Sequence, residues 1–282
     1  MTEVTVYEVG PRDGLQNEAA VIPAARKVAL IDALSACGFA RIEAASFVSP
    51  RWVPQMADGA EVMEAIARAP GTAYAALVPN MRGLAAALAA KVDEAAIFVS
   101  ATEGFSRANL NASVEESFAR LAPVAEAARE AGASLRGYVS VVTDCPFEGA
   151  VDPGAVAACA ARLVAMGCRE VSLGETLGRG TPGAVDAMLG AVLGEVPPEA
   201  LAGHFHDTSG RALENVEVAL DRGLRVFDAA AGGLGGCPYA PGAAGNLATE
   251  ALVGWLEARG HSTGIDQDRL AEAAAMARGL RA

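Results

Sequence analysis

Two histidines, His204 and His206, are the residues whose type and spacing say most about chemistry. They are two of only three histidines in the chain. Residues two apart on a β-strand point to the same face, so the pair can present two imidazoles to one ion. A pair of core or surface histidines is the competing interpretation, and the pair alone leaves both open. Asp13, which is expected to follow the first strand, favours the metal site.

A carboxylate and an amide complete the candidate ligand set. Asp13 offers the carboxylate, and Asn246 is the candidate amide. Two imidazoles with two oxygen ligands suit Mg²⁺ or Mn²⁺, with water or substrate oxygens completing an octahedron. Zn²⁺ is less favoured because no pair of cysteines accompanies the histidines.

Arg12 and Glu43 are charged residues expected at the ends of two neighbouring strands. An Arg-Asp dipeptide such as Arg12-Asp13 is ordinarily a rim salt bridge on a surface. Near a metal, a fixed guanidinium can instead polarise a carbonyl and stabilise an enolate. Glu43 lies among apolar neighbours, where a carboxylate is costly unless it faces a polar interior or pairs with a cation. We expect Glu43 to position Arg12 or the metal ligands.

A glycine-rich segment at residues 232–239 carries the thiol most suited to chemistry, Cys237. The segment could be a turn, a phosphate cradle or a mobile lid, but it lacks the Gly-Lys-Ser/Thr ending of a Walker loop. A hinged loop that delivers a thiol and excludes water is the interpretation we favour. The sequence contains no serine–histidine–acid pattern and no G-x-G-x-x-G after the first strand, which argues against hydrolases and dehydrogenases.

These residues need a scaffold that brings strand ends together, and the sequence predicts one. Short β-branched runs alternate with Ala- and Leu-rich stretches of helical spacing. Strands are expected at residues 4–8, 41–45, 73–78, 95–100, 135–142, 170–173, 202–206 and 225–229, and helices are expected to begin near residues 24, 58, 81, 113, 153, 181, 210 and 245. Eight βα units predict a TIM (β/α)₈ barrel with its active site at the C-terminal ends of the strands. A doubly wound open sheet is the alternative fold.

Composition limits the class of protein. The chain has 282 residues, of which 52% are hydrophobic, and we expect one domain over residues 1–282. A net charge of −12 argues against nucleic acid and anionic membranes as partners. Five scattered cysteines suit a reducing compartment, and the N-terminus shows no signal peptide, so we expect a cytoplasmic protein without a membrane anchor.

The sequence also resembles the 3-hydroxy-3-methylglutaryl-CoA lyases, which are members of the metallolyase barrels, a larger group named for an Asp-Arg-Glu set. The resemblance runs through nearly the whole chain. The matching segments are VGPRDGLQNE at 9–18, IEA at 42–44, SFVSP at 46–50, WVPQM at 52–56, EESF at 115–118, RGYVS at 136–140, GTPG at 180–183, GLGGCPY at 233–239 and GNLATE at 245–250.

The resemblance implies a role for each matching residue. It implies a divalent cation, Mg²⁺ or Mn²⁺, bound by Asp13, His204, His206 and Asn246. The catalytic residues it implies are Arg12, which would stabilise an enolate, Glu43, which would support the site, Cys237, the loop thiol, and the two metal ligands Asp13 and His204. It implies that Arg12, Gln16, Asn109 and Glu175 contact the substrate.

The reaction implied is a retro-Claisen cleavage of 3-hydroxy-3-methylglutaryl-CoA to acetyl-CoA and acetoacetate, as in leucine degradation and ketone-body metabolism. A homodimer is also expected from the resemblance. Three departures stand out: Glu175 where the family commonly has Asp, Phe205 between the two histidines where Cys is usual, and an altered stretch at residues 143–147. Phe205 should point away from the interior, whereas the altered stretch could reshape the acyl pocket.

Three alternatives compete with this interpretation. A lyase could act on a 3-hydroxyacyl-CoA with a larger substituent, a related barrel could be an aldolase or an acyl-CoA synthase, and a non-catalytic barrel could bind a metabolite. The Cys237 loop belongs to the lyase pattern and favours the lyase. Retention of the whole ligand set argues against the non-catalytic barrel, because buried polar groups are costly without a role.

Overall fold

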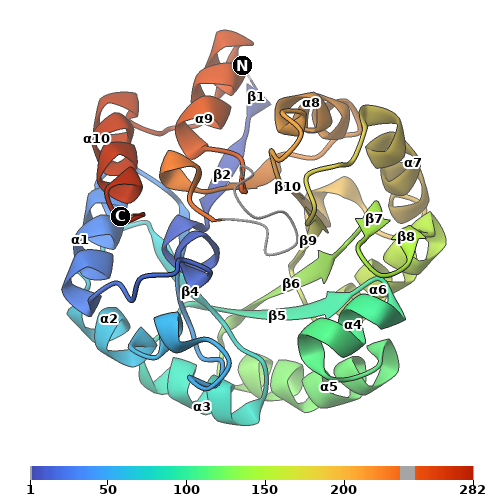
Figure 1. Ribbon diagram of the computed structural model, residues 1–282, viewed down its shortest axis with the longest axis horizontal. Coiled ribbons are helices and arrows are strands. Elements are labelled where there is room, and N and C mark those ends of the chain that lie inside the picture. The colour runs from blue at the N-terminus through green and yellow to red at the C-terminus, as the bar shows by residue number, and fades with distance from the viewer. Residues whose placement is uncertain (1, 236–244, 282) are drawn as a thin grey trace.

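The computed structural model describes residues 2–235 and 245–281, and within them eight parallel strands close into a barrel (Figure 1). The barrel strands are β2 (Thr5–Glu8), β3 (Arg41–Ser46), β4 (Ala73–Leu77), β5 (Glu94–Ser100), β6 (Ser134–Ser140), β9 (Glu170–Glu175), β10 (Leu201–Phe205) and β11 (Val226–Ala229). β11 lies between β10 and β2 and closes the ring. The predicted barrel is therefore confirmed, and the open-sheet alternative is wrong. Each predicted strand end lies within two residues of the observed end.

Helices surround the barrel (Figure 1). They are α1 (Ala24–Ser35), α2 (Gly59–Ala65), α3 (Met81–Ala89), α4 (Glu103–Leu110), α5 (Val114–Glu130), α6 (Pro153–Ala165), α7 (Pro182–Val192), α8 (Ala212–Asp221), α9 (Thr249–Ala258) and α10 (Gln267–Arg278). Among the described residues, no helix is both long and apolar enough to cross a membrane.

Most predicted helix starts are correct because the capping hydrogen bonds join residues that are only two or three positions apart in the sequence. Asp152 accepts a hydrogen bond from the Gly154 N–H, and Thr181 accepts one from the Ala184 N–H, with Pro in the first turn of each helix. Helix α9 begins four residues later than the predicted residue 245. Asn246 forms a β-bridge with His206, and Ala248 forms one with Ala230, so these residues extend the sheet before the helix begins.

Several short elements were not predicted. Strand β1 (Thr2–Glu3) pairs with β12 (His261–Ser262), and β7 (Asp144–Cys145) forms a hairpin with β8 (Gly149–Ala150). Helices α4 and α10 were also missed. A π-helical turn, η1 (Gly10–Gly14), follows β2, and a 3₁₀ turn, η4 (Ala231–Gly233), follows β11. These two turns border the barrel mouth.

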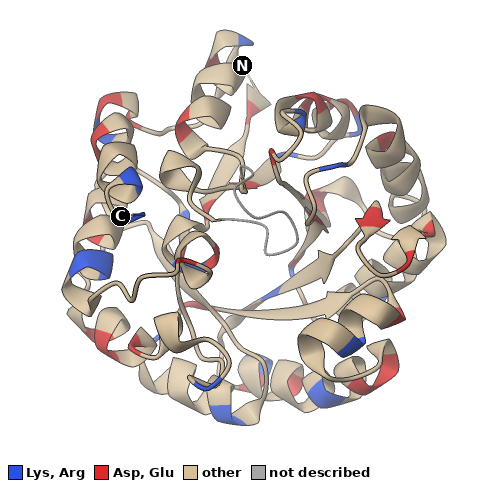
Figure 2. Ribbon diagram, in the orientation of Figure 1, with Lys and Arg blue, Asp and Glu red and all other residues tan. Residues whose placement is uncertain are grey.

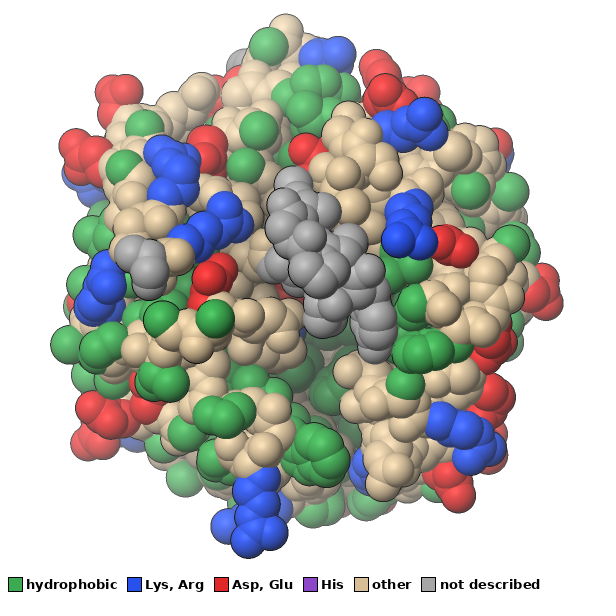
Figure 3. Space-filling model, in the orientation of Figure 1, with side chains coloured by type: hydrophobic (Ala, Val, Ile, Leu, Met, Phe, Trp, Pro, Cys, Tyr) green, Lys and Arg blue, Asp and Glu red, His purple; other side chains and the backbone are tan. Residues whose placement is uncertain are grey.

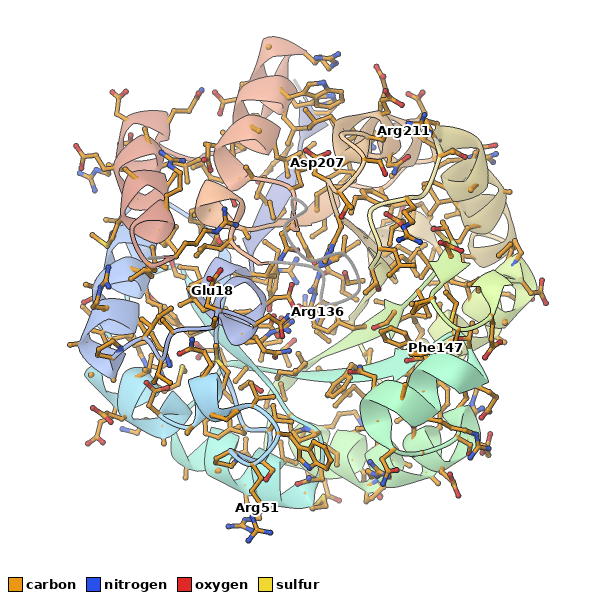
Figure 4. All side chains as sticks on the ribbon, in the orientation of Figure 1. Glu18, Arg51, Arg136, Phe147, Asp207 and Arg211 are labelled. Atoms are coloured by element: carbon orange, nitrogen blue, oxygen red, sulfur yellow. The ribbon has the colours of Figure 1, made fainter. Side chains whose placement is uncertain are left out.

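The space between strands and helices is apolar, but the barrel interior contains charges. Arg136 is fully buried near the barrel axis (Figure 4), whereas most other charged residues lie on the outer helices (Figure 2). Its guanidinium forms ion pairs with Glu170 and Asp228 and stacks over the Tyr7 ring. Barrel interiors are usually filled by branched apolar side chains. An interior of paired charges instead provides hydrogen-bonding groups beneath the mouth.

Candidate metal centre and catalytic cavity

The three expected metal ligands Asp13, His204 and His206 converge at the barrel mouth. One ligand atom from each lies within 4.8 Å of the others. His204 is on β10, His206 follows that strand directly, and Asp13 is in η1 after β2. Only β11 separates these strands, so the order of the barrel explains the convergence.

Turn η1 directs the side chains of Arg12 and Asp13 toward the mouth of the barrel. The Val9 carbonyl accepts hydrogen bonds from both backbone N–H groups, at 3.2 and 2.8 Å. Glu8 is fully buried beneath the turn and accepts hydrogen bonds from the Gly10 and Ala231 N–H groups. Gly14 has to be a glycine here, because a Cβ would lie 2.7 Å from the Leu234 Cβ. The turn is therefore packed tightly against the segment after β11.

Two hydrogen bonds from its amide nitrogen orient the side chain of Asn246. Its Nδ2 donates to the Asp13 Oδ2 at 2.8 Å and to the Leu234 carbonyl at 3.2 Å. With the nitrogen engaged, the amide oxygen is the atom that could bind a cation. The bridge to His206 fixes the backbone of Asn246 beside the histidines. The structure thus brings all four predicted ligands together.

His204 is oriented by a buried carboxylate that the sequence reasoning missed. Its Nδ1 lies 3.1 Å from the Asp228 Oδ2, which leaves Nε2 as its ligand atom. Asp228 also accepts hydrogen bonds from Arg136, at 2.6 and 3.2 Å, and from Ser172 at 2.7 Å. Burial lowers the pKa of His204, but Asp228 outweighs it and raises that pKa. The sequence does contain a signal for Asp228, because a carboxylate in an otherwise apolar strand is unusual. The same signal led to the prediction of Glu43.

The protonation states of the centre suit a divalent cation. Burial lowers the pKa of His206 to about 4, so the imidazole is neutral at pH 7. Burial raises the pKa of Asp13, but Arg12 and the two histidines outweigh it, and the pKa falls to about 2. The buried Nδ1 of His206 has no hydrogen-bond partner among the described residues. Neutral imidazole and ionised carboxylate are the forms that bind metals, so His206 and Asp13 fit a bound cation. A cation at His204 has to displace the ring proton that Asp228 favours.

Arg12 is held in a buried cluster next to the metal ligands. Its Nε donates to the Glu43 Oε2 at 2.7 Å, its Nη2 lies 2.6 Å from the same oxygen, and its Nη1 donates to the Asp13 Oδ1 at 2.7 Å. Tyr138 donates its hydroxyl to Glu43 at 3.0 Å, and its ring lies under the Arg12 guanidinium. Burial lowers the pKa of Arg12, but the two carboxylates outweigh it and raise that pKa. The predicted support of Arg12 by Glu43 is present, whereas Tyr138 was missed.

A cavity of about 200 Å³ lies at this centre. It is lined by Arg12, Asp13, Gln16, Asn17, Leu77, Phe98, Phe105, Asn109, Tyr138, Val139, Ser140, Gly174, Thr176, His204 and His206. Green side chains are visible along the lower part of the central hollow in Figure 3. Three of the four expected substrate contacts, Arg12, Gln16 and Asn109, line the cavity. The wall therefore combines the polar metal ligands with apolar side chains, among them Leu77, Phe98 and Phe105.

Glu175 is the one expected substrate contact that does not line the described cavity. It is buried, and its Oε1 accepts hydrogen bonds from the Thr143 hydroxyl and the Arg179 N–H, both at 3.2 Å. Burial raises the pKa of this carboxyl. Glu175 thus ties the altered stretch after β6 to the segment after β9.

Two other predicted features differ in outcome. Phe205 is 2% exposed and packs in the apolar core rather than in the cavity, as strand alternation requires. Cys237 lies outside the described residues. The segment that leads toward it has three glycines with positive φ, Gly232, Gly233 and Gly235, at 67°, 60° and 101°. A left-handed backbone of this kind favours glycine over other residues.

Comparisons with known proteins agree with this geometry. A family model described as HMGL-like matches residues 3–277. The chain is 54% identical to the mitochondrial hydroxymethylglutaryl-CoA lyase of Bos taurus over 273 residues, covering 97% of this chain and 84% of that protein. It is 52% identical to a 3-hydroxy-3-isohexenylglutaryl-CoA/hydroxy-methylglutaryl-CoA lyase of Pseudomonas aeruginosa, covering 96% and 90%. The crystal structure of the HMG-CoA lyase from Brucella melitensis superposes with a TM-score of 0.99 at 56% identity, covering 100% and 99%.

Proposed function

The chain belongs to the HMGL-like family, and from that premise we propose that it is a divalent-metal-dependent lyase that cleaves 3-hydroxy-3-methylglutaryl-CoA to acetyl-CoA and acetoacetate. Relatives more than 50% identical over nearly the whole chain bear the name of this lyase. The observation that carries the proposal is the Asp13, His204 and His206 cluster, which lies in the same cavity as the buried Arg12.

The cation would be held by Asp13, His204, His206 and Asn246. When bound, Mg²⁺ or Mn²⁺ supplies Lewis acidity that polarises substrate oxygens. Asp13 remains ionised because its pKa is about 2, so it acts as an anionic ligand rather than as a proton carrier near pH 7. Asp228 keeps His204 in the tautomer that directs Nε2 toward the mouth.

Arg12 provides fixed positive charge where the enolate develops. A guanidinium has five N–H groups, and Glu43 and Asp13 engage three of them, which leaves two for a substrate oxygen. Because Glu43 and Tyr138 already hold the group in place, little reorganisation is needed during cleavage. Loss of the carbon–carbon bond leaves negative charge on the acetyl-CoA fragment, and Arg12 stabilises it.

Proton transfer is assigned to the loop thiol. The reaction needs a base for the substrate hydroxyl and an acid for the enolate carbon. Cys237 is the proposed proton carrier on the basis of the family resemblance. The four described cysteines are buried, and burial raises the pKa of Cys37, Cys159 and Cys168 to about 11, 11 and 12, so these three stay protonated near pH 7.

The size of the cavity favours a small acyl group. Leu77, Phe98 and Phe105 form its apolar wall, and the volume is about 200 Å³. A methyl substituent fits such a space better than the isohexenyl chain in the name of the Pseudomonas aeruginosa relative. Asn109 and Gln16 supply polar contacts for the substrate in this proposal.

Cellular context follows as a further part of the proposal. Buried free cysteines suit a reducing compartment, which supports a cytoplasmic location. Leucine degradation and ketone-body metabolism are the processes that would use this reaction, and a homodimer is the assembly expected from the family resemblance.

Product analysis tests the proposal. The protein is incubated with 3-hydroxy-3-methylglutaryl-CoA and Mg²⁺, and the products are identified by mass spectrometry. We expect acetyl-CoA and acetoacetate in equal amounts. An unchanged thioester, or cleavage of only a 3-hydroxyacyl-CoA with a larger substituent, would contradict the assigned substrate.

A further inference from the structure

The β7–β8 hairpin packs beside the catalytic cavity, although none of its residues is among the described residues that line that cavity. The hairpin follows β6 closely, and β6 ends at Ser140, which does line the cavity. The Val151 N–H donates to the Thr143 carbonyl at 3.0 Å and closes the base of the hairpin. The hairpin thus belongs to the frame around the cavity and not to its wall.

The chain enters the hairpin through an unusual backbone conformation at Val141. Its φ is 58°, in the left-handed region that a β-branched residue rarely adopts, and the residue is fully buried. The Val141 N–H donates to the Thr176 hydroxyl at 3.0 Å, and the Val142 N–H donates to the Gly174 carbonyl at 3.1 Å. Gly174 and Thr176 both line the cavity. Such a conformation persists only where the surroundings hold it, so this end of the hairpin is fixed to the cavity wall.

The other side of the hairpin packs against the first turn of α4. The Gly104 N–H donates to the Glu148 carboxylate, and the Cys145 Sγ lies 3.1 Å from the hydroxyl of Thr102, the residue that caps α4. At Gly104, a Cβ would lie 2.8 Å from the Glu148 Oε1 and 3.0 Å from the Phe147 Cβ. Helix and hairpin therefore approach each other as closely as a glycine allows.

Phe147 contacts a residue of the cavity wall. Its ring centroid lies 6.3 Å from that of Phe105, at an interplanar angle of 51°, which is one of the arrangements that aromatic pairs favour. Phe105 is 4% exposed and lines the cavity, whereas Phe147 is 52% exposed and lies beside α4 in Figure 4. Asn109, about one helical turn after Phe105, also lines the cavity. A shift of α4 would therefore move both residues of the wall.

The wall to which Phe105 belongs is where the size of an acyl group matters. In the proposed reaction, the metal ligands and Arg12 contact oxygens of the substrate, and the methyl group on C3 is the apolar branch of its acyl part. The apolar wall of Leu77, Phe98 and Phe105 suits that branch. In a hydrophobic pocket, one methylene changes the specificity of an enzyme by about 10–200-fold. The position of Phe105 should therefore decide which substituents fit.

Resting on the proposed function, we propose that the β7–β8 hairpin sets the size of the acyl substituent that the enzyme accepts, and that Phe147 is its positioning residue. Phe147 holds the Phe105 ring against the cavity. Removal of the Phe147 ring lets Phe105 move outward, which makes room for a larger substituent. The altered stretch at residues 143–147 thus bears on substrate choice although it does not line the cavity.

The relative rates of cleavage of two thioesters test this proposal. One is 3-hydroxy-3-methylglutaryl-CoA, and the other carries a butyl group in place of the methyl group. The ratio of their kcat/KM values is measured for the wild type, Phe147→Ala, Phe147→Leu and Met276→Ala. Met276 is the matched control, because it is also an exposed apolar residue but lies in α10 and outside the cavity lining. This ratio does not depend on the fraction of folded enzyme.

We expect Phe147→Ala to lower the preference for the methyl over the butyl thioester by about tenfold, with a rise in kcat/KM for the butyl thioester. Phe147→Leu retains an apolar group beside Phe105 and should keep most of the preference, and the control should match the wild type. Phe105→Ala should lower the preference at least as much as Phe147→Ala. In that background, Phe147→Ala should add little, because the ring that it positions is gone.

Two outcomes would overturn the role of the hairpin. A wild-type preference in Phe147→Ala, including an equal loss of activity toward both thioesters, would show that Phe147 does not set the size of the substituent. An effect of Phe147→Ala that is as large without the Phe105 ring as with it would show that Phe147 does not act through Phe105. A wild-type protein that cleaves neither thioester would instead refute the proposed function, so the two failures can be told apart.

Discussion

At the scale of single residues, the centre depends on how each ligand is held. The Nδ1 of His204 is hydrogen-bonded to Asp228, and Asp228 in turn accepts hydrogen bonds from Arg136 and Ser172. A histidine ligand oriented by a carboxylate binds a cation with a preset ring direction. The affinity for the metal should therefore depend on residues that never touch it.

We predict graded losses along this chain of contacts. His204→Ala should abolish both cleavage and most divalent-metal binding. Asp228→Asn should weaken Mn²⁺ binding by about 10–100-fold and leave activity that higher metal concentrations restore in part. Calorimetric titration with Mn²⁺ measures both, and Ser172→Ala, which removes a single hydrogen bond to Asp228, serves as the mild control. Wild-type affinity in Asp228→Asn would refute the role of Asp228.

Substitution of Arg12 should lower the rate of cleavage and leave the affinity for the metal nearly unchanged. Lysine has one compact ammonium and cannot contact Glu43, Asp13 and a substrate oxygen with the fixed fork of a guanidinium. We predict that Arg12→Lys lowers kcat by roughly 10²–10³-fold while the Mn²⁺ affinity stays within a few-fold of wild type. Steady-state kinetics and metal titration of the same preparation check this. An unchanged kcat would show that Arg12 does not stabilise the enolate.

Residue types in the sequence were enough to predict His204, His206, Asp13, Arg12 and Glu43 as site residues, because each is unusual in its local setting. Asn246 was only a candidate amide until the family resemblance implied it as the fourth ligand. The roles of Tyr138 and Arg136 were not predicted, although these residues lie two positions apart on β6 and therefore point to the same face of the strand. Their importance depends on partners far away in sequence, Glu43 and Asp228. Such pairings follow from closure of the barrel, and local patterns cannot show which side chains meet inside it.

At the scale of elements, one buried carboxylate joins the segments that form the mouth. Glu8 ends β2, accepts hydrogen bonds from the Gly10 and Ala231 N–H groups, and lies 2.7 Å from the hydroxyl of Thr249 in α9. Burial raises its pKa from 4.5 to about 7. Glu8 therefore links η1, which carries Arg12 and Asp13, to the segment after β11.

This raised pKa predicts a pH effect on stability. The stabilising contribution of a raised carboxyl pKa is complete below pH 4.5 and is lost as the pH rises through about 7. In Glu8→Gln, the amide oxygen keeps the two N–H partners and the amide nitrogen can donate to Thr249. We predict that the free energy of unfolding of this variant exceeds that of wild type by up to roughly 3 kcal/mol at pH 8 and that this gain shrinks toward pH 5.

Urea unfolding at pH 5, 6.5 and 8 measures this difference. Glu61→Gln, an exposed substitution in α2, controls for loss of a charge. A gap between wild type and Glu8→Gln that does not change with pH would contradict the raised pKa of Glu8.

Packing behind β10 offers another test at this scale. The Phe205 ring occupies the space beside Gly203, where a Cβ would lie 2.7 Å from the Phe205 Cε2 and 3.0 Å from the Phe227 Cδ1. Gly203→Val should destabilise the protein by about 1–3 kcal/mol through overpacking, and Phe205→Cys by roughly 3 kcal/mol through a cavity. The double variant should lose at least 1 kcal/mol less than the sum, because the valine fills the cavity. Additive losses in urea unfolding would show that the two sites do not share this space.

Elements were predicted well where their signals are local. Pro182 after the capping Thr181 marks a helix start that needs no tertiary contact. The late start of α9 was missed because Asn246 and Ala248 bridge to segments distant in the sequence. The predicted residue 245 would have placed the fourth ligand on a helix, whereas the structure places it on an extended segment beside His206.

At the scale of the whole molecule, the barrel joins two kinds of environment. Its interior holds paired charges that orient the metal ligands, whereas most other charged residues lie on the outer helices (Figure 2). The net charge of −12 repels an anionic substrate, and the buried Arg12 supplies positive charge at the mouth. The periodic alternation of strands and helices predicted this architecture, but the charged interior could not be predicted, because strand spacing does not reveal which ion pairs form across the ring.

We predict that cleavage requires a divalent cation at the Asp13, His204 and His206 centre. The most direct measurement follows acetoacetate release from 3-hydroxy-3-methylglutaryl-CoA by protein stripped with a chelator, before and after addition of Mg²⁺ or Mn²⁺, with His204→Ala alongside. We predict no turnover after stripping, recovery with either cation in the wild type, and no recovery in the variant. Full turnover by the stripped wild type, or recovery in His204→Ala equal to that of wild type, would contradict this requirement for a cation.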